Sequence, residues 1–161
     1  MSSLPELVSR FWRGQRGVQT AELAFLLPIF LLLLVGMIDL GRGYFSWLII
    51  TNGAREGARA AIVGKPLATV GTVVQNAVSG LYVTGVDVRT GVDLGSCPST
   101  VAGRLCIMVD NLGGPSGAAT TIRVRYYFSY IALSGIMHWA GVATFPSGVQ
   151  PLNAQSTMRL E

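Results

Sequence analysis

The sequence predicts an α+β fold, in which a long N-terminal transmembrane helix precedes a small amphipathic helix packed on an antiparallel β-sheet. The first observation behind this prediction is an apolar run without any charge, from Leu23 to Ile38. The second is a set of short segments after residue 80 in which apolar and polar residues alternate, the pattern of strands with one buried face. Only 12% of the residues are charged, against about 25% in ordinary soluble domains, and the apolar run accounts for much of this deficit.

The apolar run is long enough to cross a lipid bilayer. A helix from Val18 to Ile38, in which Glu22 is the only charge, spans roughly 30 Å, the thickness of the hydrocarbon core. A helix buried in a soluble domain of this size would not need leucine on every face, as the chain has at residues 31–34. No small-x-small cleavage site follows the run, which disfavours a conventional signal peptide.

The charges on either side of the run predict its orientation. Three arginines precede it, so the positive-inside rule places residues 1–17 in the cytoplasm and the C-terminal part of the chain outside it. Arg42, just beyond the run, argues mildly the other way. Asp39 lies three residues earlier on the same helix and is placed to neutralise that charge in part.

Helical spacing continues beyond the apolar run and predicts a single helix whose first half crosses the membrane. Gly64 followed by Pro66 predicts where this helix ends. Pro28 is expected to bend it inside the bilayer. The expected organisation is a basic cytoplasmic leader (1–17), a long helix (18–63) with its transmembrane part at about 18–38, and an extracytoplasmic α+β domain (64–161).

Small residues recur at four-residue spacing in the outer half of this helix, at Gly53, Gly57 and Ala61. A stripe of this kind lets another helix approach closely. The protein's own domain and a helix of another subunit fit the stripe equally well as partners. Glu56 is expected to pair with a neighbouring molecule rather than with an arginine of its own helix.

The part after the long helix predicts one more helix and several strands. Residues 66–80 place Leu67, Val70 and Val74 on one face, which indicates an amphipathic helix. Period-two alternation then predicts strands, with one face buried, around residues 86–89, 105–110, 121–130 and 152–160.

Residues 131–145 are apolar but too short for a second membrane span. They are expected either to cap the sheet or to form an apolar tip that touches lipid or a partner. His138, next to Trp139, is interpreted as a structural histidine, because the sequence offers it no companion ligands for a metal.

The two cysteines, Cys97 and Cys106, lie in the part expected outside the cytoplasm. An oxidising compartment and an even count favour a disulfide between them. Two thiols without nearby histidines would leave a zinc ion half-ligated, so no metal site is expected.

Catalytic and nucleic-acid-binding patterns are missing from the sequence. One histidine, scattered acids and the lack of nucleophile, phosphate-binding or metalloprotease motifs predict that the protein is not an enzyme and needs no cofactor. The net charge of +4 is divided between the leader and the rest without a basic patch, so nucleic acid is not an expected partner.

Several motifs of the N-terminal third occur together. They are Arg16–Leu23 (RGVQTAEL), Pro28 within the apolar run, Asp39–Arg42 (DLGR) and Asn52–Arg59 (NGAREGAR). In this combination the segment resembles the TadE-like family of minor pilins and pseudopilins. Near the C-terminus, the alternating Val124–Tyr126 strand and the end of the chain, STMRLE, resemble the same family.

The resemblance implies assembly with the machinery of the tight-adherence (Flp type IVc) pilus and processing by a prepilin peptidase between Gly17 and Val18. Glu22 then occupies the fifth mature position, where pilin-like proteins carry an acid, and would pair with the new N-terminal amine. The residues expected to serve assembly are Glu22, Pro28, Gly53 and Gly57.

The function expected on these grounds is structural: a minor pilin or pseudopilin that is anchored in the inner membrane by its N-terminal helix and oligomerises through it. After assembly it is located either in this membrane or in a surface pilus that serves cell adhesion. Expected partners are other pilin or pseudopilin subunits, the pilus machinery, the peptidase and membrane lipid. The alternative is a permanently anchored envelope binding module that never enters a filament.

Overall fold

The computed structural model describes residues 4–97, 101–115, 117–131, 135 and 149–159; side chains are described from residue 19 onward, except that of Ser96. The chain divides into two compact units, Met1–Ile38 and Asp39–Glu161. The segment 131–145, whose role was left open above, lies outside the described residues except for Ile131 and Gly135.

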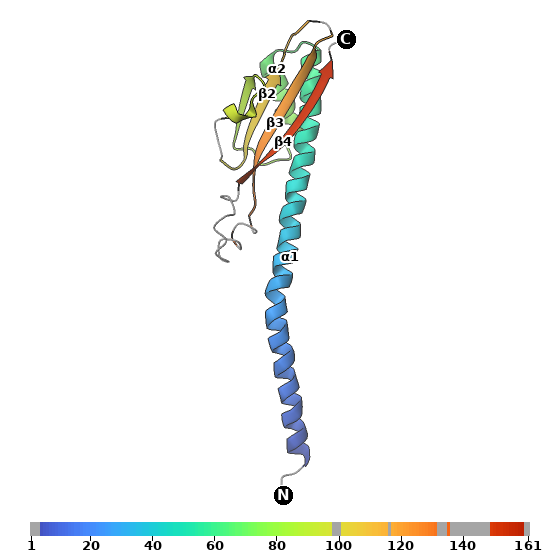
Figure 1. Ribbon diagram of the computed structural model, residues 1–161, viewed down its shortest axis with the longest axis vertical. Helices are drawn as coiled ribbons and strands as arrows, with labels where there is room; N and C mark the ends of the chain where they lie inside the picture. The colour runs from blue at the N-terminus through green and yellow to red at the C-terminus, as the bar shows by residue number, and fades with distance from the viewer. Residues whose placement is uncertain (1–3, 98–100, 116, 132–134, 136–148, 160–161) are drawn as a thin grey trace. The chain divides into compact units, whose positions relative to one another are not determined.

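The first element, α1, is a helix from Leu4 to Ile62 that contributes to both units (Figure 1). It is helical from residue 4, whereas the sequence predicted a helix from residue 18. Its end agrees with the prediction: Gly64 has a φ of +74°, and its amide donates to the carbonyl of Ala61 at 3.0 Å. Glycine adopts this left-handed conformation at no steric cost, so it ends the helix cleanly.

The second unit adds a short helix and a four-stranded sheet to the last part of α1. The elements are α2 (Leu67–Ala77), β1 (Gly85–Thr90), a 3-10 turn (Leu94–Ser96), β2 (Arg104–Asp110), β3 (Ala119–Ser129) and β4 (Val149–Arg159). The strands lie in the order β1-β2-β3-β4. The α+β class is thus confirmed, with the amphipathic helix and strands near the predicted positions.

One strand pair differs from the predicted antiparallel sheet. β2–β3 and β3–β4 are antiparallel, but β1 runs parallel to β2, with Val88 opposite Ile107. A parallel neighbour cannot be reached by a tight hairpin and needs a longer connection. The connection here runs from residue 91 to 103 and includes the 3-10 turn.

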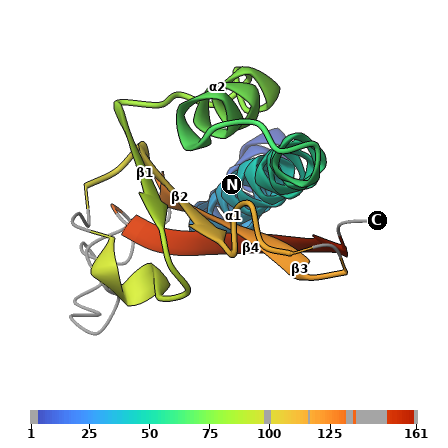
Figure 2. The same cartoon turned by 90° about the horizontal axis from the view of Figure 1, so that it is seen from above.

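Helices cover one face of this sheet. Figure 2 shows α2 and the C-terminal part of α1 on the same side of the strands. The register sets Ile107 opposite Val124, and Val124 opposite Ala154, so three neighbouring strands present apolar side chains to the helices. These side chains belong to one buried cluster with Ile50, Ala54 and Ala58 of α1, Val70 and Val74 of α2, and Val78 directly after α2.

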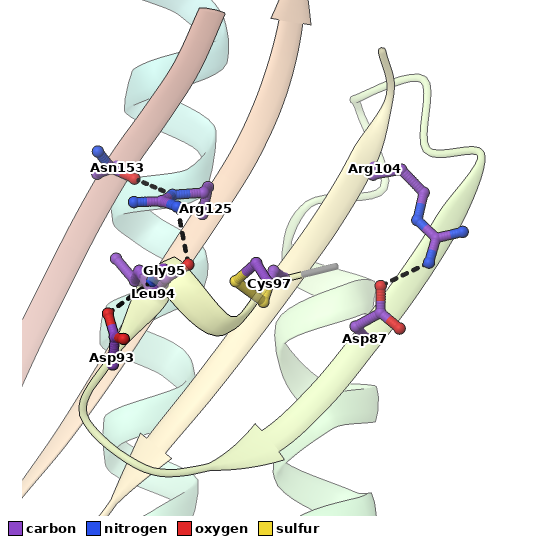
Figure 3. Close-up of a disulfide and its surroundings, with 9 residues drawn as sticks. Asp87, Asp93, Leu94, Gly95, Cys97, Arg104, Arg125 and Asn153 are labelled. Atoms are coloured by element: carbon purple, nitrogen blue, oxygen red, sulfur yellow. Dashed lines mark hydrogen bonds and ion pairs between the residues drawn. A yellow bond between two sulfur atoms is a disulfide. The ribbon is translucent and has the colours of Figure 1, made fainter. Parts of the chain in front are cut away.

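The other face of the sheet is also largely buried at its centre. Cys106 and Met108 on β2 and Tyr127 on β3 point away from the helices, yet all three are buried. The connection between β1 and β2 covers part of this face, because Arg125 donates from Nη1 to the carbonyl of Leu94 at 2.8 Å (Figure 3).

A disulfide fixes the same connection to the sheet. Cys97, directly after the 3-10 turn, is bonded to Cys106 on β2, which confirms the predicted bridge (Figure 3). Arg125 also donates from Nε to Asn153 Oδ1 at 2.8 Å, so the connection, β3 and β4 are joined through one guanidinium.

Candidate functional site

The N-terminal helix carries the features that the sequence singled out, so it is the candidate site. Within the described residues, one helical segment, Gln19–Ile62, is long and apolar enough to cross a membrane by length and composition. Large apolar side chains between Leu23 and Ile38 are exposed on all sides of the helix, including Phe25 and Met37. Exposed hydrophobic surface of this extent marks a surface that lipid or another protein covers.

Two of the predicted assembly residues lie at the start of this exposed stretch or inside it. Glu22 is on the helix with its side chain exposed, and Pro28 lies inside the helix. Proline has no N–H to donate, so the hydrogen bond that another residue would make at this position is missing. Gly17 and Val18 also lie within the helix, and their side-chain surroundings are outside the described set.

The predicted glycine stripe lies against the protein's own second helix. A Cβ at Gly53 would come within 2.7 Å of Val78 Cγ1, and a Cβ at Gly57 within 2.6 Å of Val74 Cγ2. These separations are shorter than real contacts, so the two glycines set how closely α1 and α2 approach. The sequence left two partners open for this stripe, and the structure shows contact with the protein's own domain. A role of Gly53 and Gly57 in assembly stays a prediction.

Glu56 pairs within its own helix, which corrects the expectation of a partner on another molecule. Arg59 donates from Nη1 to Glu56 Oε1 at 3.2 Å, and both side chains are exposed. The i,i+3 spacing brings the two groups together on one helix face. Exposed pairs of this kind contribute little to stability.

The pair expected between Asp39 and Arg42 is present at the start of the second unit. Arg42 Nη1 lies 3.1 Å from Asp39 Oδ1, and Asp39 is only 2% exposed. The guanidinium of Arg42 also lies over the ring of Phe128, with Cζ 5.4 Å from the ring centroid. An ion pair and a cation–π contact together hold this arginine at one position. The sequence indicated the pair, but not the aromatic ring that β3 contributes.

A buried phenol lies beside this arginine. Tyr126 donates its hydroxyl to the carbonyl of Tyr82 at 2.9 Å. Burial raises the pKa of the Tyr126 phenol, and the positive charge of Arg42 offsets part of that rise. The phenol is therefore neutral at physiological pH and acts as a hydrogen-bond donor.

Beyond Ile38 the helix has two different faces. Asp39, Gly43, Ser46 and Ile50 are buried inside the second unit. The opposite face stays apolar and exposed, with Leu40, Tyr44, Phe45, Trp47 and Leu48. The hydrophobic surface thus continues for about three more helical turns past the end of the apolar run.

The described residues contain no group of three or more His, Cys, Asp or Glu side chains that could hold a metal ion. His138, the single histidine, lies outside the described residues. What the helix offers is surface for lipid and for protein.

Comparison with protein-family models gives a match to the TadE-like protein family over residues 17–59. The matched segment includes every motif of the N-terminal third quoted above, except for the first residue of RGVQTAEL. The resemblance drawn from the sequence is thereby confirmed for this segment. Curated protein sequences and solved structures gave no significant match.

Proposed function

Because residues 17–59 match the TadE-like family, we propose that this protein is a structural component of tight-adherence pilus assembly, anchored in the inner membrane by α1. The observation that carries the proposal is the family match on the helix itself. The matched residues contain both the apolar run and the segment of α1 that packs against α2 and the sheet in the second unit (Asp39–Glu161, called the β-rich unit below).

The exposed surface of α1 supports the anchoring part of this proposal. Charged side chains are missing between Leu23 and Ile38, and the arginines of residues 10–16 lie on the N-terminal side only. The positive-inside rule then favours a cytoplasmic N-terminus and an extracytoplasmic β-rich unit. The disulfide supports the same orientation, because such bonds persist in oxidising compartments.

Within this system, we assign the protein to the minor pilins or pseudopilins, which assemble through the N-terminal helix. Cleavage between Gly17 and Val18 would remove the basic leader and create an amine four residues before Glu22. An acid and an amine in a medium of low dielectric attract strongly. Pairing of Glu22 with its own or a neighbour's amine would fix the axial register of adjacent helices.

Intact-mass measurement of the native protein tests this assignment. We expect the mass to lack residues 1–17, and the chain to stay in the membrane fraction after extraction with alkaline carbonate. If Met1 or Ser2 is the only N-terminus in membrane material, the protein is not processed as a pilin, and the permanently anchored binding module replaces this assignment. Release of the chain by carbonate would instead contradict the anchoring itself.

A further inference from the structure

A cavity of about 410 Å³ lies in the second unit, beside the first turns of its part of α1. Its described wall comes from four separate parts of the chain: Arg42 and Phe45 on α1, Tyr82 in the loop after α2, Gly103 just before β2, and Phe128 and Ile131 in and just after the end of β3. The volume falls within the range of about 300–1,000 Å³ that is usual for ligand sites.

The charge inside this cavity has one sign. Among its described lining residues, Arg42 is the only charged side chain. Its ion-pair partner Asp39 does not line the cavity and is buried: the side chain of Asp39 is 2% exposed, whereas that of Arg42 is 44% exposed. The cavity therefore faces the positive end of the ion pair.

The guanidinium has hydrogen-bonding capacity beyond this pair. Arginine carries five N–H donors in a planar fork that matches phosphate oxygens. Asp39 accepts from Nη1, and the guanidinium lies over the ring of Phe128. Among the described residues Asp39 is the one acceptor that Arg42 contacts, so donors on Nη2 and Nε can serve a second anion.

The rim of the cavity is apolar and exposed. Tyr82 and Ile131 are 81% and 68% exposed, and Phe45 belongs to the exposed apolar face of α1. A ligand that matches both the positive charge of Arg42 in the wall and the apolar side chains of the rim has an anionic group next to a hydrocarbon part. A free anion would satisfy the arginine but leave the apolar rim in water.

In the proposed membrane anchoring, Arg42 lies at the depth of the bilayer where the anionic group of a lipid is found. It follows Ile38, the end of the apolar run, by four residues of the same helix, a rise of roughly 6 Å. The polar headgroup layer on each side of the hydrocarbon core of a bilayer is also roughly 6 Å thick.

We propose that this cavity binds the phosphate headgroup of an anionic phospholipid, with Arg42 as the anion ligand and Phe45, Tyr82 and Ile131 against the glycerol and the first part of the acyl chains. The inference rests on the proposed membrane anchoring and adds lipid selectivity to it. One headgroup held by Arg42 would tie the β-rich unit to the membrane surface.

Native mass spectrometry of the full chain in detergent tests the proposal. The protein is mixed with equimolar phosphatidylglycerol and phosphatidylcholine, and the lipid adducts are counted. We expect about a ten-fold preference for phosphatidylglycerol, as one charge-assisted contact implies. The preference should disappear in Ile131→Asp, which places an acid at the rim, and in the double variant Asp39→Asn with Arg42→Gln, which removes both charges of the pair.

Two matched variants control for net charge and for exposed position. Arg55→Gln removes an exposed arginine farther along α1, and Val92→Asp adds an acid at an exposed apolar position that does not line the cavity. Both should keep the preference. Melting curves identify any variant that fails to fold, and Ile131→Asp leaves the buried pair intact if the double variant does fail.

Three results would overturn the inference. They are equal adducts of the two lipids in the wild type, a preference that survives in a folded cavity variant, and displacement of phosphatidylglycerol by millimolar inorganic phosphate, which would make this a free-anion site. None of these results affects the carbonate extraction that tests membrane anchoring. Failure of lipid binding and failure of membrane anchoring are therefore distinguishable.

Discussion

Replacing Glu22 with alanine is expected to lower co-purification of the chain with tight-adherence pilus components about ten-fold, which corresponds to one lost interaction of about 1.4 kcal/mol. The amount of protein in the membrane should stay the same or rise. A carboxylate near the start of a membrane span is costly, so its removal does not impair insertion. The side chain is exposed on α1, where a neighbouring chain can reach it.

Glu56→Ala is the matched control for this experiment. Glu56 is also an exposed acid on α1, but it pairs with Arg59 of its own helix and should be dispensable for assembly. Chemical crosslinking in membranes of equal protein content gives the comparison. If co-assembly of a correctly processed Glu22→Ala protein equals that of the wild type, Glu22 has no pairing role, and it only lies at headgroup depth near a helix N-terminus, where an acid is tolerated.

Removing the disulfide should produce a large loss of stability in the β-rich unit. The bond between Cys97 and Cys106 closes a short loop, for which chain-entropy models give roughly 2.5–3 kcal/mol. For a unit of this size, that corresponds to a melting temperature lower by about 10 °C. Cys97→Ala is the suitable variant, because Cys97 is only partly buried, whereas Cys106 is 2% exposed and contributes to packing.

Chemical reduction of the disulfide in the wild type is an internal control for the Cys97→Ala variant. Reduction of the wild type should lower the melting temperature of the full chain in detergent by the same amount, and it should leave Cys97→Ala unchanged. A Cys97→Ala protein that melts with the unreduced wild type would show that the contact between Arg125 and the Leu94 carbonyl is enough to hold the β1–β2 connection.

The elements that the sequence predicted well are those with a local signal. The apolar run and Gly64 predict a helix and its end, because helix length and a left-handed stop depend on neighbouring residues. Alternation along residues 121–130 predicts a strand and its buried face in the same way, and Ile122 and Val124 are indeed fully buried. The cysteine pair was predictable from its number and setting.

The features that were missed depend on partners distant in sequence. Period-two alternation identifies a buried face but not the direction of the neighbouring strand, so the parallel pairing of β1 with β2 was not predictable. For the same reason, the burial of Met108 on the second face was not expected. The stripe of Gly53 and Gly57 predicted a close helix contact, while the identity of the partner, α2, came only with the fold.

The cavity at Arg42 combines one feature that the sequence predicted with one that it could not predict. The i,i+3 pair with Asp39 could be inferred from spacing, since both residues lie on one helix. Phe128 follows Arg42 by more than 80 positions, and no local pattern places its ring under that guanidinium. The basic side of the pair therefore became a candidate lipid ligand only once β3 was in place.

The central claim, a role in tight-adherence pilus assembly, is tested most directly by deleting the gene in the source organism while the other pilus genes stay intact. Surface pili are counted by electron microscopy, before and after complementation with the full chain. The account predicts that deletion removes most pili and that the wild-type chain restores them. Normal numbers of pili in the deletion strain would contradict it.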